Sequence, residues 1–193
     1  MSRAKKRYAW RTLIALAIVA ILSVPLLKRG YTDYFKALYP DTYRETVNAE
    51  AEAFGIPPSL VMAVIHTESD FQPEAQSSAG ALGLMQFTED TFNWAAKRLG
   101  ENGKYTFEDL KKPEISIHYG AYLLSYLLDR WEIPETALAA YNAGSGRVSS
   151  WLADSDISAD GVHLDTIPYK ETADYVKRVT EAQNRYQTLY AMK

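Results

Sequence analysis

The sequence predicts an all-α fold, and three features of the chain support that prediction. Apolar side chains recur at helical spacing through most of the 193 residues, and Gly and Pro stand where helices would end and begin. No run of alternating β-branched residues indicates a strand. With 47% apolar and 23% charged residues, the chain can bury a core of its own, which excludes a disordered or fibrous protein.

The chain begins with a basic stub and an apolar segment. Residues 1–11 carry five basic side chains, and residues 12–27 follow without a charge. These sixteen residues fall short of the roughly 20 that span a bilayer, but flanking aromatic and basic side chains can lengthen such a helix. We therefore expect one transmembrane helix with the amino terminus inside, which puts the body on the extracytoplasmic side of the cell membrane.

A cleaved signal peptide is the alternative interpretation of the same segment, and it would make the body a secreted protein. Such a peptide needs a small-x-small site just after the apolar run, and residues 24–29 offer none. Residues 28–40 are interpreted as a juxtamembrane linker that ends at Pro40. Residues 41–193 then form one compact domain.

The charge of the chain is distributed unevenly. Seven of the 21 basic residues lie within residues 1–30, which contain no acidic residue. The remaining 14 face 24 acidic residues, so residues 31–193 carry a formal charge of −10. Because affinity for nucleic acid comes mainly from cations that neutralise phosphates, we do not expect nucleic acid as a partner.

The sequence gives no indication of a metal or a cofactor. Cysteine is absent, which excludes disulfide bonds, thiolate metal sites and cysteine nucleophiles. His66, His118 and His163 lack the i, i+4 spacing of a helical zinc site. We therefore expect neither group.

Six helices are expected in the body. The first covers residues 43–54 and ends at Gly55, and Pro57 and Pro58 open the second. The others cover residues 88–99, a stretch around 115–126 in which Gly120 allows close packing, residues 134–142, and a long terminal helix around 176–189.

The second of these helices carries a carboxyl group on an apolar face. Leu60, Val64 and Glu68 fall at i, i+4 and i+8 of a helix that is apolar nearly all round. Burial and the negative end of the helix both raise the pKa of a carboxyl, and a carboxyl protonated near neutral pH can act as a general acid. The alternative is a glutamate that turns into solvent or pairs with a lysine.

A long loop follows Glu68. Residues 69–87 are rich in small side chains, and Gly80 and Gly83 permit tight turns. The loop nevertheless carries large apolar side chains, namely Phe71, Leu82, Leu84, Met85 and Phe87. We therefore expect it to pack back on the body.

Four short motifs stand in the body in a fixed order. They are Glu68-Ser69 with Ser77, Gly80 and Ala81; Gly83-Leu84-Met85-Gln86; Ala140-Tyr141-Asn142-Ala143-Gly144 with Gly146, Arg147, Val148 and Trp151; and Ile167-Pro168-Tyr169-Lys170-Glu171-Thr172 with Tyr175 and Val176. Together they resemble the catalytic domain of Slt-type lytic transglycosylases, which cut bacterial peptidoglycan, over residues 57–190. The resemblance implies a lysozyme-like, goose-type or Slt-like helical domain over residues 41–193.

The resemblance also implies roles for individual residues. Glu68 matches the sole catalytic acid/base, and Ser77 matches a serine near that carboxyl and the acetamido group of the substrate. Tyr169 matches the tyrosine that faces the cleavage point. The positions that match groove-lining residues are Met85, Gln86, Tyr141 and Asn142. Ser116 stands where the family often has asparagine, which puts one local polar contact in doubt.

The mechanism that the family uses needs one carboxyl group, whereas most glycosidases need two. Asp70, Glu74, Glu89 and Asp90 lack an apolar context like that of Glu68. Glu68 would protonate the oxygen of the β-1,4 bond between N-acetylmuramic acid and N-acetylglucosamine. It would then accept the proton of the six-position hydroxyl, which closes a 1,6-anhydro ring without consuming water.

Two alternatives stay open at this point. The first is a hydrolytic lysozyme of related fold, and the second is an envelope module that binds glycan without cutting it. The expected partners are peptidoglycan strands and, through residues 12–27, the membrane; no feature of the sequence identifies a protein partner.

Overall fold

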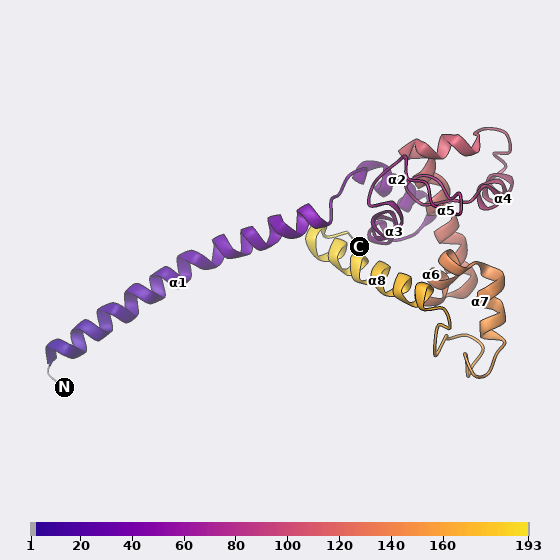
Figure 1. Ribbon diagram of the computed structural model, residues 1–193. Coiled ribbons are helices and arrows are strands. Elements are labelled where there is room, and N and C mark those ends of the chain that lie inside the picture. Colours follow the sequence, from indigo (N-terminus) through magenta and orange to yellow (C-terminus); the bar gives the residue numbers. More distant parts are fainter. Residues whose placement is uncertain (1–2, 193) are drawn as a thin grey trace. The chain divides into compact units, whose positions relative to one another are not determined.

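The computed structural model describes residues 3–192, and for residues 3–13, 15 and 18 it describes the backbone alone. The chain divides into two units, one that ends at Pro40 and one that begins at Asp41. The first unit is a single helix, α1 (Arg3–Leu38), and the second holds every other helix (Figure 1).

Helix α1 contains residues 28–38 of the segment 28–40 that was interpreted as a linker. The helix continues past residue 27 to Leu38, and side-chain pairs at i, i+4 support this continuation. Arg29 Nε lies 3.8 Å from Asp33 Oδ2, and the rings of Tyr31 and Phe35 have centroids 4.5 Å apart. Among the described residues, no helix combines the length and the apolar character of a membrane span. The expected transmembrane segment, residues 12–27, lies partly outside the residues whose side chains are described.

The second unit is built from helices, as the sequence predicts. Its elements are α2 (Arg44–Phe54), α3 (Pro58–Ser69), α4 (Glu89–Leu99), the 3-10 helix η1 (Phe107–Lys111), α5 (Pro113–Trp131), α6 (Pro134–Ala143), α7 (Ser145–Leu152) and α8 (Lys170–Tyr190). Within residues 3–192, β structure is limited to two isolated bridges, in which Leu82 pairs with Gln76 and with Phe87. The all-α prediction is confirmed for this part of the chain.

Two short helices were not expected. Helix α7 follows Gly144 directly, and its serines and glycine are poor helix formers. Its buried Val148 and Trp151 are three residues apart, so packing of one face stabilises it. Helix η1 begins at a capping box. The Thr106 side chain accepts a hydrogen bond from the Asp109 backbone N–H, and the Asp109 side chain accepts one from the Thr106 backbone N–H.

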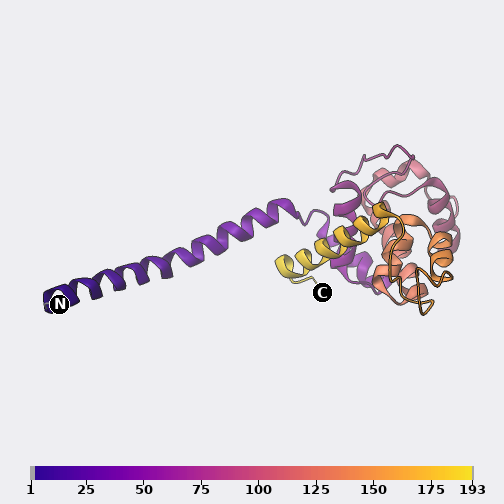
Figure 2. The same cartoon turned by 60° about the horizontal axis from the view of Figure 1, so that its bottom comes forward.

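Helix α3 is the centre of the second unit. Its residues 59–65 are buried, and it packs against α2, α5 and α8. Helix α6 packs against α5, α7 and α8. Residues 153–169 form an irregular connection beside α7 in both ribbon views (Figures 1 and 2). This arrangement brings the carboxyl end of α3, the carboxyl end of α6 and the amino end of α8 to one side of the core.

The loop between α3 and α4 is packed on the core, as predicted. Its five large apolar side chains are all buried. The Ser69 hydroxyl donates a 2.9 Å hydrogen bond to the Leu84 carbonyl, and the Met85 N–H donates a 3.2 Å bond to Ser116 Oγ. Ser116 thus makes a polar contact of its own with this loop.

Two glycines allow this loop to lie so close to its neighbours. A Cβ on Gly83, whose φ is 81°, would collide with the carbonyl of Leu110. A Cβ on Gly120 in α5 would collide with Met85 Sδ, which confirms that Gly120 allows close packing. The loop is therefore fixed by backbone contacts as well as by side-chain burial.

Candidate active site

A cavity of about 500 Å³ opens where α3, the loop after it, α6 and α8 meet. Its lining includes five of the seven predicted site residues, namely Glu68, Ser77, Gln86, Tyr141 and Asn142. The lining also includes Glu171 of the fourth motif, so residues from all four sequence motifs are brought to one surface. Met85 and Tyr169 are not part of this lining.

Glu68 lies in the last turn of α3 and is half-buried. Burial raises the pKa of Glu68 to about 7, and two neighbours oppose that rise. They are the Tyr175 hydroxyl and the positive charge of Arg178, which both favour the ionised carboxylate. The position of Glu68 on the apolar face of its helix predicted this direction. Near neutral pH the carboxyl can therefore both donate and accept a proton.

Tyr175 is a site residue to which the sequence analysis gave no role. Its side chain is buried, and within the described chain its hydroxyl makes no hydrogen bond of ordinary length. That hydroxyl still lowers the pKa of Glu68, so the two groups lie near each other. Burial raises the pKa of Tyr175 well above its usual value, so the hydroxyl stays a neutral donor. Its spacing with Val176 and Val179 is typical of a core position, so the sequence did not indicate that its hydroxyl acts on Glu68.

Tyr141 connects α6 to the loop after α3. Its hydroxyl donates a 2.8 Å hydrogen bond to the Met85 carbonyl. Its ring lies parallel to that of Tyr175, with centroids 6.4 Å apart and 7° between the planes. Burial raises the pKa of Tyr141, and the nearby charge of Glu68 adds to that rise. Because its hydroxyl is already used, Tyr141 presents mainly an aromatic ring to the cavity.

Asn142 is oriented by the fourth motif. The hydroxyl of Thr172, which is buried at the start of α8, donates a 2.8 Å hydrogen bond to Asn142 Oδ1. The amide nitrogen of Asn142 is then available to donate into the cavity. Motifs that lie 30 residues apart in the chain thus form one unit.

Ser77 and Gln86 take part in the structure of the loop as well as in the lining of the cavity. Ser77 Oγ accepts a 3.0 Å hydrogen bond from the Ala81 N–H, which leaves its own hydroxyl proton to donate. Gln86 Nε2 donates to the carbonyls of Ala75 and Gly83 at 3.1 and 3.0 Å. The oxygen of the Gln86 amide is then the atom that can face a ligand.

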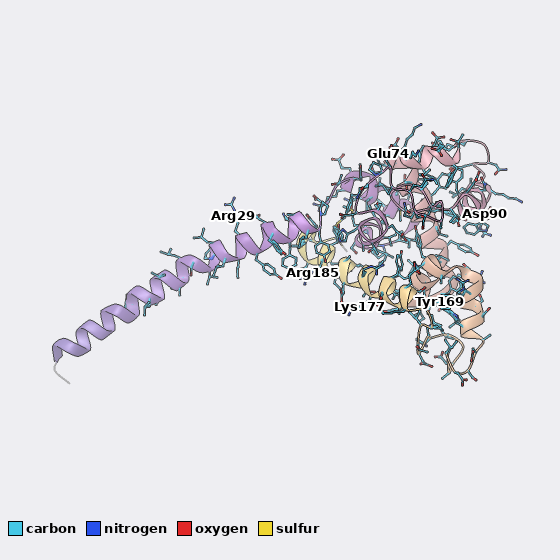
Figure 3. The ribbon with its side chains drawn as sticks, viewed as in Figure 1. Arg29, Glu74, Asp90, Tyr169, Lys177 and Arg185 are labelled. Atoms are coloured by element: carbon cyan, nitrogen blue, oxygen red, sulfur yellow. The ribbon has the colours of Figure 1, made fainter. Side chains whose placement is uncertain are left out.

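Met85 and Tyr169 lie outside the lining of the cavity, and their contact with substrate stays a prediction. Met85 is fully buried. Its sulfur packs against Gly120, and its carbonyl accepts the hydrogen bond from the Tyr141 hydroxyl. Tyr169 stands just before α8 (Figure 3) and is 49% exposed. Its ring packs edge-on against Trp151 at 5.4 Å.

A second carboxylate, Glu171, also lines the cavity and was not considered in the sequence analysis. It lies in the first turn of α8 and is exposed. Its place between Tyr169 and Thr172 in the fourth motif was the signal that could have identified it. Asp70, one of the carboxylates that were considered, does not line the cavity, and its Oδ1 lies 3.2 Å from His66 Nδ1. Among the described residues, no group of His, Asp and Glu could hold a metal ion.

Comparison with known proteins supports the resemblance to Slt-type lytic transglycosylases that the motifs indicated. The family model described as "Transglycosylase SLT domain" matches residues 45–162. The chain is 34% identical over 158 residues to the soluble lytic murein transglycosylase of Escherichia coli K12, an alignment that covers 80% of this chain and 24% of that protein. It is 30% identical over 174 residues to the membrane-bound lytic murein transglycosylase C of Histophilus somni strain 2336, which covers 79% of this chain and 48% of the relative. The chain thus spans about a quarter to a half of these relatives.

Solved structures show the same fold. The 70 kDa soluble lytic transglycosylase of E. coli superposes with a TM-score of 0.73 at 28% identity, over 97% of this chain and 30% of that one. It has also been solved in complex with bulgecin A. An inactive mutant of the lytic transglycosylase Slt of Pseudomonas aeruginosa, in which a glutamate is replaced by glutamine, gives a TM-score of 0.68 at 31% identity, over 80% of this chain and 25% of that one.

Proposed function

The chain belongs to the transglycosylase SLT family, and from this premise we propose that it is a peptidoglycan lytic transglycosylase. The enzyme would cleave the β-1,4 bond between N-acetylmuramic acid and N-acetylglucosamine and leave a 1,6-anhydro end. One observation carries the proposal: Glu68 stands in a cavity that can take sugar rings, with a pKa raised to about 7 by burial. An acid in this range can serve both proton transfers of the reaction.

In the first step, Glu68 donates its proton to the bridging oxygen. The bond from that oxygen to the anomeric carbon of the N-acetylmuramic acid breaks, and the N-acetylglucosamine leaves with the proton. The positive charge that develops on the sugar is stabilised by its own acetamido carbonyl or by the new carboxylate. The Tyr175 hydroxyl and the charge of Arg178 favour the ionised form of Glu68 at this stage.

In the second step, the Glu68 carboxylate accepts the proton of the six-position hydroxyl. The oxygen of that hydroxyl bonds to the anomeric carbon, and the 1,6-anhydro ring closes. Glu68 returns to its protonated form, and no water is consumed. Glu68 therefore acts as an acid in the first step and as a base in the second.

We also propose the binding roles that the motifs suggested. The Asn142 amide nitrogen and the Ser77 hydroxyl donate to the polar groups of the sugars, and the Gln86 amide oxygen accepts. The ring of Tyr141 provides a flat apolar surface for a sugar face. Met85 and Tyr169 act at the edges of this groove, with Tyr169 toward the cleavage point.

A hydrolytic lysozyme is the second candidate function, because Glu171 gives the cavity a second carboxylate. In that case Glu171 would activate a water molecule, as the base of an inverting glycosidase does. Glu171 is exposed in the first turn of α8, and the products of cleavage distinguish the two reactions. A module that only binds glycan would not need an acid with the pKa of Glu68.

We propose further that residues 12–27 anchor the protein in the cytoplasmic membrane and that the catalytic domain, residues 41–193, lies on the extracytoplasmic side. Two observations support this placement. Leu16, Ile21 and Leu26 are 61%, 70% and 72% exposed on α1, so water would face a long apolar surface if no lipid covered it. The second is that one relative is named a membrane-bound enzyme. Secretion after cleavage is the alternative, and the amino-terminal sequence of the cellular protein distinguishes the two.

Mass spectrometry of the products from purified glycan strands tests the activity. We expect chains that end in 1,6-anhydro-N-acetylmuramic acid, which are lighter by one water than the hydrolytic products. Reducing ends in their place would identify a lysozyme. Bound but intact strands would identify a binding module.

A further inference from the structure

Tyr169 differs from the other proposed site residues because it ends a loosely held segment. It closes residues 153–169, whose side chains are mostly exposed, and its own side chain is 49% exposed. Its backbone is fixed, because the Tyr169 carbonyl accepts a 2.9 Å hydrogen bond from the Ala173 N–H at the start of α8 (Figure 3). The ring of such a residue can still turn about its side-chain bonds unless another element holds it.

Helix α7 supplies two contacts to this ring. Trp151, which is buried, meets the Tyr169 ring edge to face, with 74° between the two planes. The Arg147 guanidinium lies 5.0 Å from the centroid of the same ring, within the range of a cation–π contact. Arg147 and Trp151 are four residues apart, so they share one face of α7. The two side chains thus form one support for Tyr169.

Arg147 also contacts the wall of the cleft. Its Nη1 donates a 3.3 Å hydrogen bond to the carbonyl of Ala143, and Ala143 belongs to the lining of the cavity that contains Glu68. The ion pairs among the described residues do not include Arg147, although residues 31–193 carry a formal charge of −10. The contacts of this guanidinium are therefore a ring and a carbonyl at the edge of the cleft.

The neighbouring cation, Lys170, makes a different contact. It follows Tyr169 directly in the chain, and its ammonium group pairs with Asp174 one turn further along α8. The cation–ring contacts within the described part of the chain include Arg147 over Tyr169 and do not include Lys170. Loss of the Lys170 charge is therefore a matched control for loss of the Arg147 charge.

We infer that Arg147 is a positioning residue of the proposed reaction and acts by holding the Tyr169 ring at the edge of the groove. The inference rests on the proposed function, in which Tyr169 stands toward the cleavage point. A cation over the ring and an indole at its edge restrict the rotation of the side chain. Because a misplaced group at a reaction centre slows the reaction, a ring that is already oriented favours the step in which the glycosidic bond breaks.

A double-mutant cycle with the full-length protein in detergent tests the inference on glycan strands. Arg147→Gln should lower kcat about fivefold, the effect of one exposed cation–π contact, and should leave KM nearly unchanged. In a Tyr169→Leu background the same substitution should have almost no effect on kcat, because no ring is left to hold. Arg147→Lys keeps a cation and should retain part of the rate. Lys170→Gln, which removes the neighbouring charge, should leave kcat unchanged.

The outcomes separate this inference from the proposed function. An unchanged kcat in Arg147→Gln, or an equal loss with and without the Tyr169 ring, would overturn the inference and leave the function standing. A loss in Lys170→Gln as large as that in Arg147→Gln would overturn it as well, since charge alone would then explain the effect. If the wild type forms no anhydro products, the proposed function itself fails. Circular dichroism shows whether a lost rate comes from a lost fold; in that case Arg147→Met, which keeps an unbranched side chain, replaces Arg147→Gln in the cycle.

Discussion

Two irregular segments of similar length lie near the candidate active site, and they are held in different ways. In residues 70–88, the large apolar side chains are buried and the backbone is bonded to α3 and α5. In residues 153–169, Ser158 alone is buried, and the bonds are local turns around acidic side chains. An irregular segment can thus be a fixed part of an active site when it has its own core contacts. We expect residues 153–169 to tolerate changes that residues 70–88 do not.

The largest effect is expected at Glu68, in the last turn of α3 just before residues 70–88. Glu68→Gln keeps the shape of the side chain but cannot donate a proton. Because it removes the only proposed acid/base, cleavage should fall by at least about 10⁴-fold, the upper end for general acid/base catalysis. Anhydro product formation from glycan strands measures the loss. Substantial residual turnover would show that another carboxyl group, with Glu171 as the first to test, carries the reaction.

A matched pair of glycine substitutions compares the two segments directly. Gly83→Ala would place a Cβ against the Leu110 carbonyl at a positive φ, and we expect a loss of about 3 kcal/mol in the free energy of unfolding. Gly161→Ala also has a positive φ, but its Cβ would meet its nearest neighbour at an ordinary 3.7 Å. The expected loss there is about 1 kcal/mol. Urea unfolding of both variants measures the difference, and equal losses would contradict the comparison.

Removal of one side-chain hydrogen bond from each segment is a gentler test. Ser69→Ala removes a buried bond to the Leu84 carbonyl, which should cost about 1–2 kcal/mol. Asp160→Asn weakens the turn around His163, where all the groups are exposed. We expect its melting temperature to stay within the error of the wild type. A larger loss at Asp160 than at Ser69 would show that the second segment is structurally coupled to the core.

The smallest effect concerns pH and tests the electrostatics of the fixed region. Since the proposed first step needs protonated Glu68, kcat/KM should fall as the pH rises through about 7. Arg178 lowers the pKa of Glu68, so Arg178→Gln should move this alkaline limb to higher pH. Lys177→Gln, a neighbour with no such action on Glu68, is the control. A limb that moves to lower pH in Arg178→Gln would contradict the assignment.

The same pKa has a consequence for stability. A carboxyl whose pKa is higher in the folded than in the unfolded state destabilises the fold as the pH rises between the two values. For Glu68 this window runs from about 4.5 to about 7. Glu68→Gln should therefore lose this part of the pH dependence and be at least as stable as the wild type above pH 7. The proposed acid/base thus lowers the stability of the domain that holds it.

The sequence predicted the parts of the molecule that depend on local patterns. Helical spacing and end signals located the longer helices, and the apolar face of α3 predicted the raised pKa of Glu68. Patterns of this kind could not identify α7, whose residues form a helix because Val148 and Trp151 are buried by other elements. They also could not assign Tyr175, because its spacing is that of a core residue and its action on Glu68 joins α8 to α3.

The continuation of α1 to Leu38 sets a length scale for the proposed anchor. Eleven helical residues after Leu27 extend about 17 Å, whereas the same residues as a flexible chain would reach about 36 Å. A shorter spacer narrows the range of distances from the membrane at which a tethered enzyme can work. Its effective concentration within that range rises as a result. With the anchor in place, the helical form of residues 28–38 would shorten the tether, and the enzyme would meet glycan that lies nearer to the lipid surface.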